Sequence, residues 1–172
     1  MNQLQSITLI GMPGAGKSTI GVLLAKELAK DFVDTDVLIQ VREQKTLQAI
    51  MDATDYLNLR RIEEEVILAT DLRNHVIATG GSAVYGDAGM QHLKAYGPVV
   101  FLSASLAELQ RRIHNYASRG IARSPDQSFD DVFAERNRLY RHYADITVEC
   151  DGKNQAVVIE ELLSQLAGVG QF

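Results

Sequence analysis

The segment Ile7–Ile20, which reads ITLIGMPGAGKSTI, constrains the fold more than any other part of the chain. It contains Gly11-x4-Gly16-Lys17-Ser18, the spacing of a phosphate-binding P-loop. The apolar run before the glycines is typical of a short buried strand, and the residues after them have helical spacing. Such a turn lets backbone N–H groups converge on phosphate oxygens at a helix N-terminus. The alternative is a glycine-rich turn that binds nothing.

Two polar side chains of the motif have defined chemistry. Lys17 would place a point charge at the β- and γ-phosphates of a nucleotide, and the Ser18 hydroxyl would ligate Mg²⁺. The sequence therefore predicts a nucleotide and Mg²⁺ as cofactors. The nucleotide-binding residues predicted at the loop are Gly14, Ala15, Gly16, Lys17, Ser18 and Thr19.

Length and composition favour one globular domain spanning residues 1–172. The net charge of −5 argues against a nucleic-acid partner. No apolar run approaches the ~18 residues of a membrane span, and the N-terminus lacks a signal-peptide pattern, so we expect a cytoplasmic protein without a membrane partner. The single cysteine, Cys150, excludes an internal disulfide and a cysteine zinc site.

The arginines are unevenly distributed along the chain. Seven of the eleven lie between residues 111 and 141, a window that contains only four acidic residues. A local positive excess in an acidic protein suggests an anionic ligand, although a solvated helix face explains part of it.

Short apolar runs alternate with helical patterns along the whole chain. Predicted strands are Ser6–Ile10, Asp31–Val33, His75–Ala78, Val99–Leu102 and Ile146–Val148. Predicted helices are Lys17–Lys30, Val37–Met51, Tyr56–Leu72, Ala88–Ala95, Leu106–Tyr116, Phe129–Tyr143 and Gln155–Leu166. This alternation predicts an α/β fold with a parallel sheet covered by helices on both faces. Ligands of such sheets lie at the carboxyl ends of the strands.

Two carboxylates follow the second predicted strand, in Asp34-Thr35-Asp36. One can hold Mg²⁺, directly or through water, while the other faces the phosphate acceptor. Alternatively, one of the two caps the helix that begins near Val37. Capping by one carboxylate does not exclude a metal role for the other.

Two further features precede the middle of the chain. Arg60 and Glu63 are i,i+3 neighbours on a predicted helix and can pair, which would fix the guanidinium. Taken alone, the motif is better explained by an exposed helix with ordinary charge pairs. Gly80 and Gly81 follow the third strand and either allow close approach of a ligand or only end the strand.

The segment 115–128 is polar, is broken by Gly120 and Pro125, and carries Arg119 and Arg123. It is predicted to be a mobile lid that closes over phosphates, with a plain surface connection as the alternative. Beyond it, the stem of Arg136 can pack in the core while its head reaches the site.

Taken in order, these motifs resemble the shikimate kinase family, over roughly Ile7–Val148. The resemblance implies a three-layer P-loop kinase fold with a five-stranded parallel sheet and a lid. It also implies transfer of phosphate from Mg-ATP to the 3-hydroxyl of shikimate in aromatic amino-acid biosynthesis. The implied partner is a small hydroxy-acid, and the expected oligomeric state is a monomer.

The resemblance implies roles on the nucleotide side of the site. Lys17 and Ser18 match the nucleotide- and metal-binding pair, and Asp34 matches the acid that holds Mg²⁺ through water. Arg119 matches the lid arginine that reaches the phosphates. Arg112 matches an arginine near the adenine.

It implies roles on the acceptor side as well. Asp36 matches the acid that binds the substrate hydroxyls and is proposed as proton acceptor. Arg60 and Arg136 match the arginines on the substrate carboxylate, with Glu63 supporting the first, and Gly81 matches a backbone contact. The implied catalytic residues are Lys17, Asp36 and Arg119.

The chain departs from the family pattern around the pocket. Ser82 replaces a third glycine, and no Gly-Glu or Phe-Arg precedes Glu63. The lid reads Arg-Gly-Ile-Ala at 119–122, and Gly-Lys-Asn-Gln at 152–155 replaces the Arg-x-Pro on the adenine side. A kinase for another hydroxy-acid or a nucleotide therefore remains a second hypothesis. A non-catalytic nucleotide-binding module is a third, which the Lys17, Ser18 and two-aspartate combination disfavours.

Overall fold

The computed structural model describes residues 5–113 and 121–168. Five strands form one sheet in the order β2-β3-β1-β4-β5, and every neighbouring pair is parallel. The strands are β1 (Ile7–Ile10), β2 (Asp31–Asp34), β3 (His75–Ala78), β4 (Val99–Ser103) and β5 (Ile146–Glu149). The predicted five-stranded parallel sheet is therefore confirmed.

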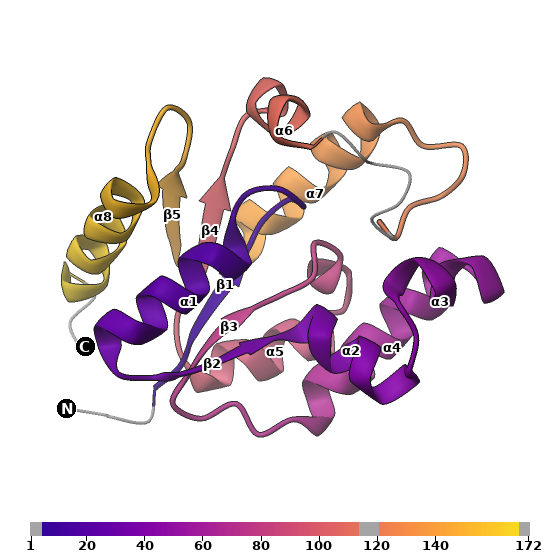
Figure 1. Ribbon diagram of the computed structural model, residues 1–172, viewed down its shortest axis with the longest axis horizontal. Coiled ribbons are helices and arrows are strands. Elements are labelled where there is room, and N and C mark those ends of the chain that lie inside the picture. Colours follow the sequence, from indigo (N-terminus) through magenta and orange to yellow (C-terminus); the bar gives the residue numbers. More distant parts are fainter. Residues whose placement is uncertain (1–4, 114–120, 169–172) are drawn as a thin grey trace.

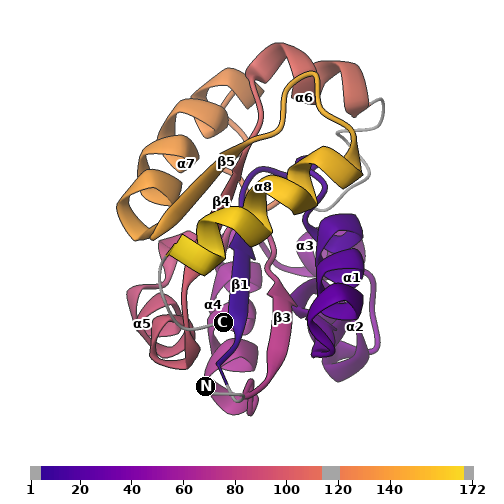
Figure 2. The same ribbon diagram turned by 90° about the vertical axis from the view of Figure 1, so that its left-hand side faces the viewer.

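Helices cover both faces of this sheet (Figures 1 and 2). One face carries α1 (Lys17–Leu28) and α8 (Gln155–Gly168). The other carries α5 (Asp87–Tyr96) and α7 (Phe129–Tyr143), with α4 (Tyr56–Ala69) packed against α5. The shorter elements are α2 (Thr35–Glu43), α3 (Leu47–Ala53), the 3-10 turn η1 (Ala83–Tyr85) and α6 (Leu106–Arg112). No helix in the described ranges combines the length and apolar character needed to cross a membrane.

The core explains why β1 is the central strand. Ile7, Leu9 and Ile10 are completely buried, because both faces of a parallel sheet are covered and an apolar run suits both. Thr8 lies opposite Ile77 of β3 and Val99 of β4. This register brings the carboxyl ends of β1, β2 and β3 to one edge, where the P-loop, the two aspartates and the paired glycines meet.

A second, smaller core lies beyond β2, where α2, α3 and α4 pack together (Figure 1). Its buried residues include Ile39, Ile62 and Ala122. Ala122 belongs to the predicted lid, yet only 3% of it is exposed. The interpretation of the whole 115–128 segment as a loop outside the core is therefore wrong at this residue. Residues 114–120 lie outside the described part of the chain.

The single helix predicted at Val37–Met51 is two helices. Gln44 ends α2 in the left-handed conformation, with φ 52°, and the Thr46 side chain caps α3 by accepting from the Ala49 amide at 3.2 Å. The break lies in the polar run 42–46, which contains no glycine, asparagine or proline, so no local signal marks it. The start moves as well, because α2 begins at Thr35.

Candidate active site

The P-loop between β1 and α1 is shaped by its glycines. Gly16 caps α1 in a left-handed conformation with φ 97°, which a residue with a side chain rarely adopts. No side chain fills the cap of this helix. The first amide groups of α1 are therefore available to an anion, which the helix dipole also favours.

Lys17 lies at the start of α1 and is only 8% exposed. Its Nζ donates to the carbonyl oxygens of Gly11 at 2.7 Å and Met12 at 3.0 Å. Burial lowers the pKa of Lys17 to about 8, although the negative charge of Asp36 opposes that shift. A desolvated cation held by two neutral carbonyls gains from an incoming polyphosphate.

Asp34 makes two contacts at the end of β2. Its Oδ1 accepts from the Asp36 amide at 3.0 Å and so caps α2, which confirms the capping prediction for one of the pair. Its Oδ2 accepts from the Ser18 hydroxyl at 2.5 Å. Ser18 and Asp34, the two residues predicted to hold Mg²⁺, are therefore in direct contact. Asp36 contributes its backbone amide to this arrangement and not its carboxylate.

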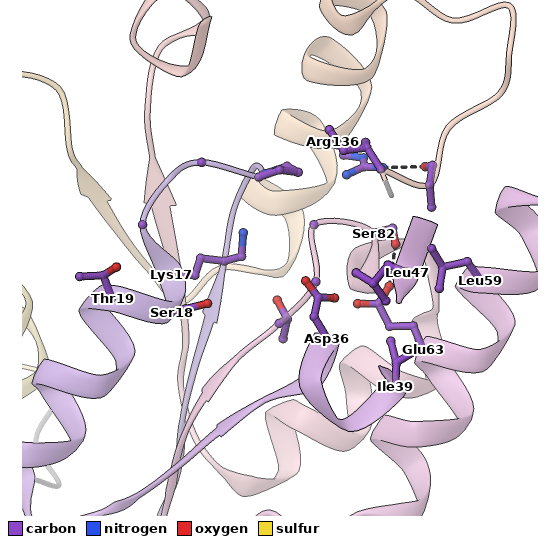
Figure 3. A pocket seen from close by; sticks show the side chains of 18 residues that line it. Lys17, Ser18, Thr19, Asp36, Ile39, Leu47, Leu59, Glu63, Ser82 and Arg136 are labelled. Atoms are coloured by element: carbon purple, nitrogen blue, oxygen red, sulfur yellow. Dashed lines mark hydrogen bonds between the residues drawn. The ribbon is translucent and has the colours of Figure 1, made fainter. Parts of the chain in front are cut away.

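A cavity of about 430 Å³ opens at this edge of the sheet (Figure 3). Its charged lining residues come from four elements: Lys17, Asp36, Glu63 and Arg136. The polar lining also includes Ser18, Thr19 and the backbone of Gly81. Burial, followed by the nearby charge of Asp34, raises the pKa of Asp36 to about 6. A cation on the P-loop side and a guanidinium on the other give the cavity two anion-binding ends.

Glu63 on α4 is 2% exposed and makes one hydrogen bond. Its Oε2 accepts from the Ser82 hydroxyl at 2.6 Å, whereas the buried Oε1 has no partner among the residues that the structure describes. A Cβ built on Gly80 would lie 2.3 Å from that Oε1 and 2.7 Å from Asp36 Oδ1, so both carboxylates converge on one point that only glycine leaves open. Burial and the charge of Asp36 raise the pKa of Glu63 to about 7.

Arg60 does not pair with Glu63, contrary to the i,i+3 prediction. Within the described residues its guanidinium forms no ion pair, and its Nε is buried without a partner. Instead it lies over the ring of Tyr85, with 3.5 Å from its Cζ to the ring centroid. Glu63 is held by Ser82, so the support expected for Arg60 comes from elsewhere. Arg60 is also absent from the cavity lining.

Arg136 on α7 is 1% exposed, so both its stem and its head are buried. Its Nη2 donates to the Ala122 carbonyl at 2.7 Å, and Arg60 Nη2 reaches the same oxygen at 3.2 Å. Figure 3 shows Arg136 above the cavity, on the side opposite Glu63. A Cβ on Gly81 would lie 2.8 Å from Arg136 Nη1, so that guanidinium packs directly on the Gly81 backbone.

A second cavity of about 410 Å³ lies on the other side of the P-loop. Its lining includes Gly14, Ala15, Arg112, Cys150 and Lys153. Arg112 is held by Glu108, with Nε donating to Oε1 at 2.6 Å. Residues of the P-loop form part of the wall of this cavity, and its volume is sufficient for a nucleoside. Arg119 falls outside the described residues.

Three residues important to this geometry escaped sequence reasoning: Ser82 as the partner of Glu63, Tyr85 as the surface under Arg60, and Ala122 as a shared acceptor. In the sequence, Ser82 is visible only as a departure from the third glycine of the family pattern. Its contact spans 19 positions, and no local spacing reports such a contact.

Comparison with known proteins identifies the family. The sequence model described as "Shikimate kinase" matches residues 13–167. The chain belongs to the shikimate kinase family. The shikimate kinase of Pseudomonas aeruginosa is 39% identical over 94% of this chain and 95% of its own length. That of Chromohalobacter salexigens is 37% identical over 95% of this chain and 92% of its own length. A solved shikimate kinase from Acinetobacter baumannii, in complex with shikimate, superposes with a TM-score of 0.85, at 27% identity over 99% and 97% of the two chains.

Family membership makes the chain a small-molecule kinase with ATP as its phosphoryl donor. The P-loop kinase fold and the enzyme class expected from the motifs are both confirmed.

The Ser82–Glu63 contact gives a stability prediction. Ser82→Ala leaves both oxygens of a buried carboxyl without a partner, and we expect a loss of about 1–3 kcal/mol in the free energy of unfolding at pH 8. The hydroxyl lowers the pKa of Glu63, so its removal raises that pKa further. A carboxyl whose folded pKa is raised loses stability as the pH rises through it, so the deficit grows above about pH 7.

Denaturant titrations at pH 5 and pH 8 measure this deficit. The matched control is Ser103→Ala, which removes a hydroxyl that donates to the exposed Glu149 at 2.8 Å. We expect a smaller loss in the control because water replaces the lost bond. Equal deficits at the two pH values for Ser82→Ala would contradict the role given to Glu63.

Proposed function

We propose that this kinase transfers the γ-phosphoryl group of ATP to the 3-hydroxyl of shikimate. One observation carries the proposal: a single cavity holds a P-loop lysine at one end, a buried arginine at the other and an aspartate between them. Shikimate is a hydroxylated carboxylate, which matches that order of charges. The shikimate complex of the Acinetobacter baumannii relative supports the same acceptor.

On the donor side, we assign the phosphates to the P-loop residues 14–19 and to Lys17. The transition state of phosphoryl transfer needs positioning and charge neutralisation more than covalent chemistry. Lys17 is already dehydrated and therefore requires little reorganisation to meet developing negative charge. The second cavity, with Arg112 on its wall, is assigned to the adenosine part. Arg119 is proposed as a further phosphate contact from the lid.

The residues of the loop also fit Mg²⁺. Ser18 Oγ and Asp34 Oδ2 are hard oxygen donors in direct contact, and Mg²⁺ takes one or two protein oxygens together with phosphates and waters. Among the described residues no group of three or more His, Cys, Asp or Glu side chains could hold a metal, so phosphates would have to complete the shell. When bound, Mg²⁺ would neutralise charge on the β- and γ-phosphates.

On the acceptor side, Arg136 and Arg60 bind the carboxylate, and Asp36 orients the hydroxyls. A guanidinium presents paired donors that match a carboxylate. Gly81 contributes its backbone, which lies against Arg136. Asp36 accepts the hydroxyl proton as the new P–O bond forms, and its raised pKa makes it a better acceptor than an ordinary aspartate.

The role of Asp36 predicts a pH dependence. The carboxylate must be unprotonated to take a proton, and its pKa is raised to about 6. We therefore expect kcat/KM for shikimate to fall as the pH drops below about 6, by about tenfold per unit. Initial rates at fixed Mg-ATP from pH 5 to 8 measure this limb. Glu63→Gln should retain it, whereas its loss in that variant would assign the limb to Glu63.

A turnover assay tests the function itself. Purified protein with Mg-ATP should release ADP in proportion to added shikimate, and phosphorus NMR should show one new phosphate monoester. ADP release that does not change when shikimate is added would refute the proposal. Binding of ATP without turnover on any acceptor would favour a nucleotide-binding module.

A further inference from the structure

Two positively charged side chains meet at the edge of the cavity, Arg60 from α4 and Arg136 from α7. Arg60 Nη2 and Arg136 Nη2 share the Ala122 carbonyl, at 3.2 and 2.7 Å. In the described part of the chain neither guanidinium forms an ion pair with a carboxylate. Arg136 is buried and Arg60 is half-buried, so the two like charges repel each other, and one backbone dipole offsets only part of that repulsion. Nearby carboxylates offset part of this repulsion at longer range, Glu135 for Arg60 and Asp36 and Glu63 for Arg136. A group in direct contact with both guanidiniums would offset more of it.

Tyr85 lies in that position. Arg60 Cζ is 3.5 Å from the centroid of its ring, and Arg136 Cζ is 5.6 Å from the same centroid. The face of an aromatic ring carries partial negative charge and attracts a guanidinium most strongly where water is excluded. Tyr56 approaches Arg60 less closely, at 5.0 Å. Among the described residues, Tyr85 is therefore the aromatic ring that lies near both guanidiniums.

The ring of Tyr85 is itself held in place. Its hydroxyl hydrogen-bonds to Glu135 Oε1 on α7, and Glu135 Oε2 accepts from Gln127 Nε2 at 3.2 Å. Gln127 belongs to the segment that precedes α7, and its backbone carbonyl accepts from Arg123. These contacts fix the ring at its hydroxyl end. Tyr85 lies in η1, which comes shortly after the glycine turn at the end of β3.

We propose that Tyr85 is a positioning residue that holds Arg60 and Arg136 together as one carboxylate-binding pair. It takes the place of the Glu63 ion pair expected for Arg60, because Glu63 is engaged by Ser82. Because both guanidiniums reach the Ala122 carbonyl oxygen, their donor groups lie close enough together to act on one small anionic group. The inference rests on the proposed assignment of these arginines to the acceptor carboxylate.

The test compares the ring with the hydroxyl of Tyr85. Tyr85→Leu removes the aromatic face, and we expect KM for shikimate to rise about tenfold with kcat changed by less than about threefold. Tyr85→Phe keeps the ring and should stay within about twofold of the wild type. KM for ATP should not change in either variant. Tyr143→Leu is the control, because the Tyr143 hydroxyl also donates to a carboxylate, Asp87 at 2.7 Å, and its ring contacts neither arginine in the described part of the chain.

A substrate analogue separates positioning from a general loss of structure. The carboxamide of shikimate lacks the charge that the arginine pair recognises, so Tyr85→Leu should raise its KM by no more than about twofold. An equal rise for shikimate and the carboxamide, or no rise for shikimate, would overturn the proposal. If Tyr85→Leu does not fold, Tyr85→Met and calorimetric binding of shikimate without nucleotide give the same comparison. Wild-type turnover with shikimate tests the proposed function separately.

Discussion

Replacing Lys17 with methionine should lower kcat/KM for Mg-ATP by about 10²- to 10³-fold without unfolding the protein. The lysine is 8% exposed, and burial lowers its pKa to about 8. Its positive charge in the free enzyme is therefore disfavoured by the loss of contact with water. Methionine removes that charge and keeps most of the stem. We therefore expect the free energy of unfolding to stay constant or to rise.

Steady-state kinetics and a thermal melt of the same preparation measure both effects. Lys26→Met is the control, because Lys26 is exposed on the same helix, and it should change neither quantity by much. A Lys17→Met enzyme with near wild-type kcat/KM would show that phosphate charge is neutralised elsewhere. A large fall in stability would show that the lysine has a structural role.

Replacing Arg136 with methionine should raise KM for shikimate by about 10²-fold, the loss of one to two hydrogen bonds to a charged group. KM for ATP should remain within about twofold, because the P-loop is untouched. Arg136 is 1% exposed and lines the cavity, so no arginine on the protein surface can take over its contact with the substrate. Arg136→Lys should recover only part of the loss, since an ammonium group lacks the paired donors.

The control for this substitution is Arg138→Met, an exposed arginine two positions along α7, which should leave both KM values unchanged. Arg136→Met with an unchanged KM for shikimate would show that the carboxylate binds elsewhere. A collapse of ATP binding would show that Arg136 belongs to the nucleotide site.

The sheet and the phosphate loop could be predicted because their signals are local. Ile7–Ile10 is an apolar run that suits burial on both faces, and the Gly11–Ser18 spacing is a backbone requirement confined to eight residues. The Asp34 cap is equally local, since its acceptor and donor are two positions apart. Each of these features depends on neighbours in the sequence.

The errors concern contacts between distant segments. Arg60 and Glu63 have helical spacing for a pair, but Ser82 from the β3 turn takes the carboxylate and Tyr85 takes the guanidinium. Sequence spacing does not show which of several possible partners Arg60 or Glu63 contacts. The distances from these residues to Ser82 and Tyr85 depend on how α4 packs against η1. The break at Gln44 was missed for another reason: a left-handed residue at the end of a helix is normally signalled by glycine or asparagine, and position 44 has neither.

Acceptor specificity provides the most direct test of the whole account. With Mg-ATP, kcat/KM should be measured for shikimate, its carboxamide, gluconate and nucleoside monophosphates. A cavity with an arginine end, an aspartate and a P-loop lysine predicts that shikimate exceeds each of the others by at least about 100-fold. A higher kcat/KM for any other member of the panel would contradict the assignment of this cavity to shikimate.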